Sequence, residues 1–408
     1  MMSYKSNGPT LDKSIHKQMK YLLLISYFLL LSLFAIFSYV LANTNLFMLN
    51  ADWFVATQNW LWQRLLPLQL ERSIIYGGLI LALFANYLLI IKNWAKSPIK
   101  NSKSFYLYLL ILATPLILAY NSLSYDVFNY MFNAKMVIEY QADPHVKVAL
   151  NFADDPWLRF MNNTHTPAPY GYTWTILSLL PYLLGFGKFL SIWLSFKLFA
   201  LASLLLTVWI LSKMQSKINL RSLAIFAFNP LVLIEVLVNA HNDLWMMSLA
   251  LIAMYLWQHP VKKGSYLLSS LLMSISVMIK FASLVIWPFF LRFSHKILQN
   301  YYYEAMSLVM FLPLFTERSK QFLPWYLLWS LTFVPLLHNK MLRNFLLVMS
   351  FAAMLRYLPW MYYLPWMSYH LDSSNLETYQ LYTTWIPAVI YLLSIVIFRI
   401  YKLTHAKK

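Results

Sequence analysis

The chain has 408 residues, of which 60% are hydrophobic and only 11% are charged, and apolar runs of roughly 15–23 residues recur along its whole length. A soluble domain could not bury this much apolar surface, and a transmembrane β-barrel would instead show alternating segments of about ten residues. The composition therefore predicts an all-α polytopic membrane protein and excludes both other classes.

The formal net charge of +18 follows from membrane topology and does not indicate a nucleic-acid partner. Because cytoplasmic loops of membrane proteins are enriched in Lys and Arg, we assign the basic loops between the apolar runs to the cytoplasm. With Lys5 they hold 21 basic residues but only two acidic ones, Asp12 and Glu304. Both termini are therefore predicted inside, and the segment 121–187 outside. The other basic residues of these loops are Lys13, Lys17, Lys20, Lys92, Lys96, Lys100, Lys103, Lys213, Lys217, Arg221, Lys262, Lys263, Arg292, Lys296, Lys340, Arg343, Arg399, Lys402, Lys407 and Lys408.

The apolar runs predict a bundle of about ten to twelve transmembrane helices. The first run follows a polar, basic stretch without a cleavage site of small residues, so we expect it to remain as an anchor. We predict a single integral membrane domain over residues 1–408, with no separate soluble domain. The runs lie near 21–42, 73–91, 104–121, 188–211, 221–238, 243–258, 265–280, 281–292, 300–316, 322–338, 342–357 and 380–399.

Two segments are expected to differ from simple spanning helices. The runs 265–280 and 281–292 are short for a bilayer core of about 30 Å, which favours a broken or re-entrant hairpin. The apolar segment 170–186 ends in Gly185 and Gly187, a pattern typical of a re-entrant or tilted helix on the outer side.

Asp126 is the strongest candidate for a functional side chain. It lies in Ser-Leu-Ser-Tyr-Asp-Val-Phe-Asn-Tyr (residues 122–130), where an apolar run gives way to the longest non-spanning segment of the chain. A carboxylate at the edge of the membrane is costly to bury and is a functional candidate by default. We interpret the later acids Asp143, Asp154 and Asp155 as parts of a solvated loop.

The residues around Asp126 predict an amphipathic helix over 125–140. Large apolar side chains recur there every three or four residues and form one face, namely Tyr125, Phe128, Phe132, Met136 and Tyr140. A helix of this kind lies at the membrane interface, where it would hold Asp126 at the depth of the lipid headgroups.

Several further motifs share the outer side of the predicted topology. They are Thr-Pro-Ala-Pro-Tyr-Gly-Tyr-Thr-Trp at 166–174, Asn-Pro-Leu-Val-Leu-Ile-Glu at 229–235, Asn-Ala-His-Asn-Asp at 239–243, Lys-Phe-Ala-Ser at 280–283 and Pro-Trp-Tyr-Leu-Leu-Trp at 324–329. With the Tyr-Asp pair at 125–126, the chain resembles the bacterial polyprenyl-phosphate-sugar-dependent glycosyltransferases of the GT-C superfamily, especially the α-mannosyltransferase-like branch. The resemblance covers residues from about 104 to 338.

The resemblance implies transfer of a hexose, with mannose as the first expectation, on the outer face of the cytoplasmic membrane. The donor would be a polyprenyl-phosphate sugar, and the acceptor a hydroxyl of a glycan or glycolipid. Asp126 matches the position of the family's general base. The candidates for sugar or acceptor binding are Tyr125, Asn129, His165, Tyr170, His241, Asn242, Asp243, Trp325 and Tyr326.

The required chemistry agrees with these residue types. A sugar hydroxyl is a poor nucleophile, so a carboxylate that accepts its proton would contribute about 10²–10⁴-fold to the rate. The leaving lipid phosphate gains charge, which cations near the outer helix ends would stabilise. The candidate cations are Lys280, Arg318, Lys320 and Arg356. The chain has no cysteine and hence no thiolate chemistry. Its sequence indicates no cofactor, and the use of a divalent metal stays open.

Two other functions remain open at this point. A lipid-linked sugar flippase or transporter would be expected to repeat its motifs between the two halves of the chain, and no such repeat is found. A polysaccharide ligase or polymerase shares the membrane-embedded cavity but would be expected to have its large polar loop later in the chain.

Overall fold

The computed structural model describes residues 10–42, 48–262, 264–290, 301–316, 322–363 and 373–405. Every regular element in these ranges is helical, which confirms the predicted all-α fold class.

Five helical segments in the described ranges are long and apolar enough to cross a membrane. They are α1 (Thr10–Val40), α3 (Gln69–Lys92), α7 (Phe189–Met214), the consecutive helices α15 (Lys340–Leu355) and α16 (Tyr357–Tyr363), and α17 (Ser373–His405). A sixth candidate combines α8 (Leu220–Ala227) with α9 (Pro230–Leu233) and η4 (Ile234–Val238), and it bends by 57° at its break. The chain is therefore a polytopic membrane protein, as predicted.

Shorter apolar helices occupy the other predicted spans. They are α4 (Ser102–Ile117), α10 (Asp243–Gln258), α11 (Gly264–Ile279), η5 (Phe281–Phe290), α13 (Tyr302–Val309), η6 (Leu312–Phe315), η8 (Pro324–Tyr326), α14 (Leu327–Leu331) and η9 (Val334–Leu336). The sequence predicts single spans at 300–316 and 322–338, whereas the structure breaks each into short helices. Pro313, Pro324 and Pro335 lie in the first turns of η6, η8 and η9, where a residue without a backbone N–H is tolerated.

The break predicted between the runs 265–280 and 281–292 is present. The helix α11 ends at Ile279, Lys280 occupies the break, and η5 contacts both α11 and α10. The Ser276 hydroxyl donates a hydrogen bond to Oγ of Ser283 at 2.9 Å across the break. Lys280 therefore lies at a fixed turn between two packed helices.

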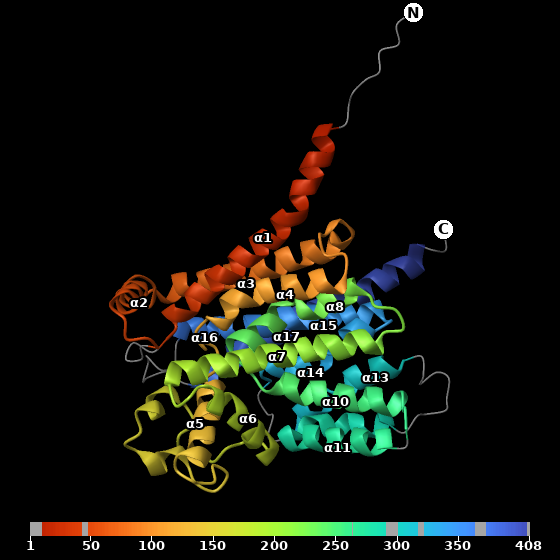
Figure 1. Cartoon of the computed structure of the whole chain (residues 1–408). Helices are drawn as coiled ribbons and strands as arrows, with labels where there is room; N and C mark the ends of the chain where they lie inside the picture. The colour runs from red at the N-terminus through yellow and green to blue at the C-terminus, as the bar shows by residue number, and fades with distance from the viewer. Residues whose placement is uncertain are drawn as a thin grey trace, which may run out of the picture.

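The sequence pattern does not predict α2 (Asp52–Leu65), because polar residues interrupt its apolar positions. In Figure 1 this helix lies beside the end of α1. Trp53 and Trp60 on its surface are 67% and 58% exposed. Exposed tryptophans at the end of a long apolar helix are typical of the belt that forms at a membrane interface.

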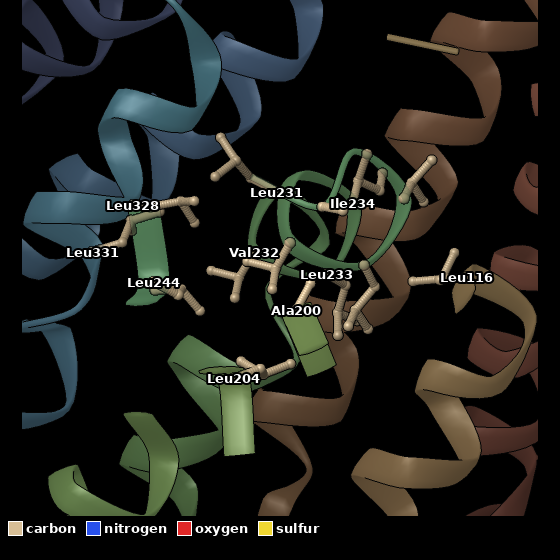
Figure 2. Close-up of a cluster of buried hydrophobic side chains, with 14 of the residues drawn as sticks. Leu116, Ala200, Leu204, Leu231, Val232, Leu233, Ile234, Leu244, Leu328 and Leu331 are labelled. Carbon is tan, nitrogen blue, oxygen red and sulfur yellow. The ribbon is translucent and has the colours of Figure 1, made fainter. Parts of the chain in front are cut away.

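The interior is built around α9 and η4. Figure 2 shows Leu231, Val232, Leu233 and Ile234 among side chains from four other helices: Leu116 of α4, Ala200 and Leu204 of α7, Leu244 of α10, and Leu328 and Leu331 of α14. All residues of η4 are buried, and this element is a single π-helical turn, a form that is frequent at functional sites. Because apolar side chains surround this segment, its charged residue Glu235 lies in the protein interior.

The predicted helix after Asp126 is confirmed as α5 (Asp126–Ile138). Its residues from Val127 to Met136 are all buried, so the central part of the apolar face that the pattern assigns to the interface, Phe128, Phe132 and Met136, is covered by protein. The covering elements are η2 (Ala149–Phe152), η3 (Pro156–Phe160), α6 (Tyr172–Leu184) and α7. Figure 1 shows α5 and α6 at one end of the helix bundle, away from the start of α1 and the end of α17.

The interpretation of Asp155 as a solvated residue is wrong. Its side chain is buried, and its Oδ2 lies 2.6 Å from Nζ of Lys135 and accepts a hydrogen bond from the Tyr140 hydroxyl at 2.6 Å. Asp143 and Asp154 are exposed, as predicted. The Asp155 ion pair therefore ties the loop after α5 back to that helix.

Candidate active site

A cavity of about 990 Å³ is bounded by the loop before α6, the break between α11 and η5, the helix η6 and the start of α14. Asp126 and Lys280, which carry opposite charges, both line it. Much of the remaining wall is aromatic or aliphatic, including Tyr170, Tyr172, Phe281, Leu284, Val285, Leu312, Leu323, Trp325, Tyr326 and Trp329. The cavity can therefore accommodate a ligand with both apolar and charged parts.

Asp126 is the first residue of α5, and the N-terminus of a helix favours a negative charge. Its Oδ2 accepts a hydrogen bond from the Tyr170 hydroxyl at 2.6 Å and lies 3.3 Å from Nδ1 of His241. The side chain is nevertheless 17% exposed. Asp126 is therefore held in place and still accessible from the cavity.

His241 is held by an anchored turn between η4 and α10. The carbonyl oxygen of Val238 accepts hydrogen bonds from Asn121 Nδ2 at 2.6 Å and from Lys197 Nζ at 2.5 Å. Ala240 then has a φ of 56°, in the left-handed region that residues with a side chain rarely adopt. The strain at Ala240 and the two anchors direct the His241 ring toward α5.

Glu235 forms a row of three ionisable side chains with His241 and Asp126. Its Oε2 lies 3.4 Å from Nε2 of His241, on the nitrogen that does not face Asp126, and neither Glu235 nor His241 has any exposed side-chain surface. Glu235 also accepts hydrogen bonds from Tyr357 at 2.9 Å and from Asn239 Nδ2 at 2.7 Å. The imidazole is thus enclosed between two carboxylates.

This row changes the proton affinity of two of its members. Burial alone lowers the pKa of His241, but its contacts with Asp126 and Glu235 outweigh burial and raise the pKa to about 9. Burial raises the pKa of Asp126, but His241, Tyr170 and Lys280 together outweigh it, so that the pKa is lowered. At neutral pH, His241 is therefore a cation, and Asp126 is ionised.

Lys280 supplies the cation of the cavity wall. Its Nζ lies 2.8 Å from Oδ1 of Asp243, which also accepts a hydrogen bond from Trp329 Nε1 at 2.5 Å. The ammonium group is 5.6–5.8 Å from the ring centres of Tyr170, Tyr326 and Trp329, within the range of cation–π attraction. With 19% of its side chain exposed, Lys280 can also meet a ligand.

Gly171 joins the Asp126 side of the cavity to the Lys280 side. Its N–H donates to the carbonyl oxygen of Ile279 at 3.2 Å. A Cβ at this position would lie 1.7 Å from the carbonyl oxygen of Met278, which is far inside contact distance. Only glycine fits this close approach between the loop and the end of α11.

We expect Gly171→Ala to destabilise the protein by about 1–3 kcal/mol, because the added methyl group forces two backbone segments apart. Thermal unfolding of the purified protein in detergent measures this effect. Gly78→Ala in α3 is the matched control, since no atom lies within 4 Å of its added Cβ. Equal unfolding temperatures for Gly171→Ala and the wild type would contradict the close approach.

The structure brings together five of the predicted site residues at the cavity: Asp126, Lys280, Tyr170, Trp325 and Tyr326. Three others, His241, Asn242 and Asp243, are buried directly behind the wall, with His241 stacked on Trp325 at a ring distance of 4.0 Å. His241 contacts the cavity-lining Asp126 and Asp243 contacts the cavity-lining Lys280, but none of the three lines the cavity itself.

The other predicted residues lie apart from the cavity wall. Tyr125 packs on the aromatic rings of Tyr120 and Phe128, Asn129 is buried in α5, and His165 is exposed. Arg356 is 4% exposed and lies between α15 and α16, where it does not line the cavity. Arg318 and Lys320 lie outside the described residues.

The sequence does not show which residue forms an ion pair with Glu235, and Lys280 is one candidate partner. The structure pairs Lys280 with Asp243 and Glu235 with His241. An acid within an apolar segment is itself a functional candidate, and this signal marks Glu235 in the sequence. Gly171 and Trp329 lie in the motifs at 166–174 and 324–329, but nothing in those motifs distinguishes either residue from its neighbours.

In the described ranges, no group of three or more acidic or histidine side chains is arranged to hold a metal ion. Asp126 and Glu235 contact opposite nitrogens of the same imidazole, so their oxygens do not converge on one point.

Comparison with known proteins identifies one family. Residues 31–295 match the model of the MptA_B family, described as Alpha-(1->6)-mannopyranosyltransferase, N-terminal domain. Comparisons with curated proteins and with solved structures gave no match.

Proposed function

The chain belongs to the alpha-(1->6)-mannopyranosyltransferase N-terminal domain family, and from this membership we propose that it transfers mannose from a polyprenyl-phosphate donor to a hydroxyl of a glycan or glycolipid acceptor. The observation that carries the proposal is the presence of Asp126 and Lys280 in the wall of one cavity. A carboxylate suits a proton acceptor, and an ammonium group suits a phosphate.

Asp126 is the general base of the proposed reaction. The acceptor hydroxyl loses its proton to Asp126 while its oxygen attacks the anomeric carbon of the donor sugar. The bond between that carbon and the phosphate oxygen breaks, and the lipid phosphate leaves with the electron pair. The hydrogen bond from Tyr170 and the contact with His241 hold the carboxylate in position for this transfer.

Lys280 binds the donor phosphate and stabilises the charge that it gains on leaving. The ion pair with Asp243 supports this role, because it fixes the position of the ammonium group in the cavity wall. The rings around Lys280 shield part of its ammonium group from water, which strengthens its attraction for a phosphate oxygen. Asp243 remains as the counter-ion when the phosphate departs.

The rest of the cavity wall suits the two ends of such a donor. Tyr170, Trp325 and Tyr326 offer ring faces of the kind that pack against a sugar. The polyprenyl chain would leave along Phe281 and Leu312, which are 67% and 56% exposed. The proposal includes no metal or other cofactor.

We propose that the cavity faces the outer side of the cytoplasmic membrane and that both termini are inside. A cysteine engineered at residue 150 is then expected to react with an impermeant thiol reagent in intact cells, and one at residue 262 is not. Native thiols do not interfere, because the chain has no cysteine. Labelling at 262 but not at 150 would overturn this orientation.

The purified protein with a panel of polyprenyl-phosphate hexoses tests the choice of donor. Mannose is expected to be transferred, and transfer of another hexose in its place would replace mannose in the proposal. The flippase remains the second candidate only if the donor stays intact with every acceptor while the same protein moves the lipid in proteoliposomes.

A further inference from the structure

We propose that Glu235 is a positioning residue for the reaction, which acts on Asp126 through the ring of His241. This inference rests on the proposed role of Asp126 as the general base. Glu235 itself does not line the cavity, so it has no direct part in the binding of donor or acceptor.

The first argument is the cost of burying Glu235. Its side chain has no exposed surface and lies in a segment packed by apolar side chains on several helices (Figure 2). An isolated carboxylate in such a place is strongly unfavourable, so it needs a compensating partner. In the described part of the chain, the ion pair that Glu235 makes is with His241.

The second argument is the number of N–H groups on the ring. A neutral imidazole has a single N–H, whereas the imidazolium has two. Asp126 faces one ring nitrogen and Glu235 faces the other, so each carboxylate can face a ring N–H only when His241 is protonated. Glu235 therefore keeps an N–H directed at Asp126 by favouring the cationic form of the ring.

Other titratable groups around the row are arranged on its two ends. Near Asp126 are the hydroxyl of Tyr170 and, across the cavity, Lys280 with its partner Asp243. At the Glu235 end, Tyr357 of α16 donates a hydrogen bond, and Tyr76 of α3 lies close enough to interact electrostatically. The two groups in direct contact with the His241 ring nitrogens remain the carboxylates Asp126 and Glu235.

The test is the pH profile of the mannosyl transfer by Glu235→Gln in the full-length protein. The glutamine keeps the size of the side chain but removes its charge, so His241 loses its proton at a lower pH. The alkaline limb of kcat is expected to move down by at least about one pH unit, with KM changed less than about two-fold. Glu235→Asp keeps the charge, so its alkaline limb should lie between those of the wild type and Glu235→Gln.

Glu304→Gln is the matched control. Glu304 is also a buried glutamate, but it accepts hydrogen bonds from the backbone N–H groups of His338 and Asn339 at the start of α15. Its variant loses the same charge and is expected to keep the wild-type pH profile. A Glu235→Gln profile that coincides with the wild type overturns the proposal.

A second measurement needs no substrate and separates this inference from the proposed function. His241 has a pKa raised to about 9 in the folded protein, above the usual value of about 6.5, so its stabilising contribution is complete below about pH 6.5 and is lost as the pH rises through about 9. The difference in Tm between the wild type and His241→Asn should follow this course, and in the Glu235→Gln background it should disappear at lower pH.

Nitrogen-15 NMR of histidine-labelled wild-type protein gives the same answer if Glu235→Gln does not fold. The spectrum of His241→Asn identifies the signal of His241. Both ring nitrogens are expected to be protonated at pH 7.5, and a neutral ring at this pH would overturn the proposal. If the Tm difference disappears at lower pH in the Glu235→Gln background but no sugar is transferred, the proposed function fails while the effect of Glu235 on His241 stands.

Discussion

Asp126→Asn is expected to lower turnover at least about 100-fold, while folding and donor binding persist. The asparagine keeps the size of the side chain and its contact with the Tyr170 hydroxyl, but it cannot accept the proton of the acceptor. Initial rates of mannosyl transfer at saturating donor measure the effect.

The control for this variant is Asp154→Asn, which changes an exposed carboxylate in the same outer segment. It is expected to have wild-type turnover. Near-normal turnover of Asp126→Asn would make Asp126 a structural residue and would remove the base from the mechanism.

Lys280→Gln is expected to lower kcat/KM for the donor by about 10²–10³-fold, the usual loss when a group that stabilises developing charge is removed. Lys280→Arg should retain part of the activity, since it keeps the charge but changes its shape. The control is Lys147→Gln, which removes an exposed lysine from the same outer segment.

The loss in Lys280→Gln has two possible physical origins that a double variant separates. Asp243 has no exposed side-chain surface, so removal of Lys280 leaves a buried carboxylate without its ion pair. In Lys280→Gln with Asp243→Asn this unpaired charge is absent. If the double variant recovered wild-type kcat/KM, the role of Lys280 would be to neutralise Asp243, and its assignment to the donor phosphate would be wrong.

The parts of the fold that sequence could predict are those that depend on local patterns. Long apolar runs predict α3 and α7 within a few residues, and the break at Lys280 follows from the shortness of the runs on either side. The helix α2 is not predicted because its polar residues interrupt the apolar pattern. Its exposed tryptophans are recognised as an interface belt only once the helix is seen in the structure. Prolines inside the runs 300–316 and 322–338 divide each run into short helices. A prediction that uses only the length of an apolar run does not include this effect.

Sequence could predict which candidate residues lie at the cavity where few other residues competed for the same place. Asp126 stands alone at the end of an apolar run, and Tyr170 belongs to a motif in the same segment, so both are found from sequence. The partners of buried charges are harder to predict, because several opposite charges compete and only packing decides among them. Lys280 pairs with Asp243, and the buried Asp155 pairs with Lys135, which lies 20 positions earlier in the chain.

Arg356 is a residue that sequence analysis selects as a candidate but that the structure places away from the cavity. Its position near a predicted outer helix end makes it a candidate for phosphate binding, and a window of sequence does not reveal that α15 contributes no residue to the cavity wall. In the structure its side chain is buried away from the cavity wall. Lys280 is therefore the phosphate ligand that we propose among the described residues.

The most direct test of the proposed function is a transfer assay with purified protein in detergent, where there are no two membrane sides between which a lipid could be moved. The protein is incubated with polyprenyl-phosphate mannose and a panel of glycan and glycolipid acceptors, and the products are identified by mass spectrometry. We predict that mannose leaves its lipid and appears on an acceptor hydroxyl with the wild type but not with Asp126→Asn. Intact donor with every acceptor, together with movement of the same lipid by the protein in proteoliposomes, would contradict the transferase and support a flippase.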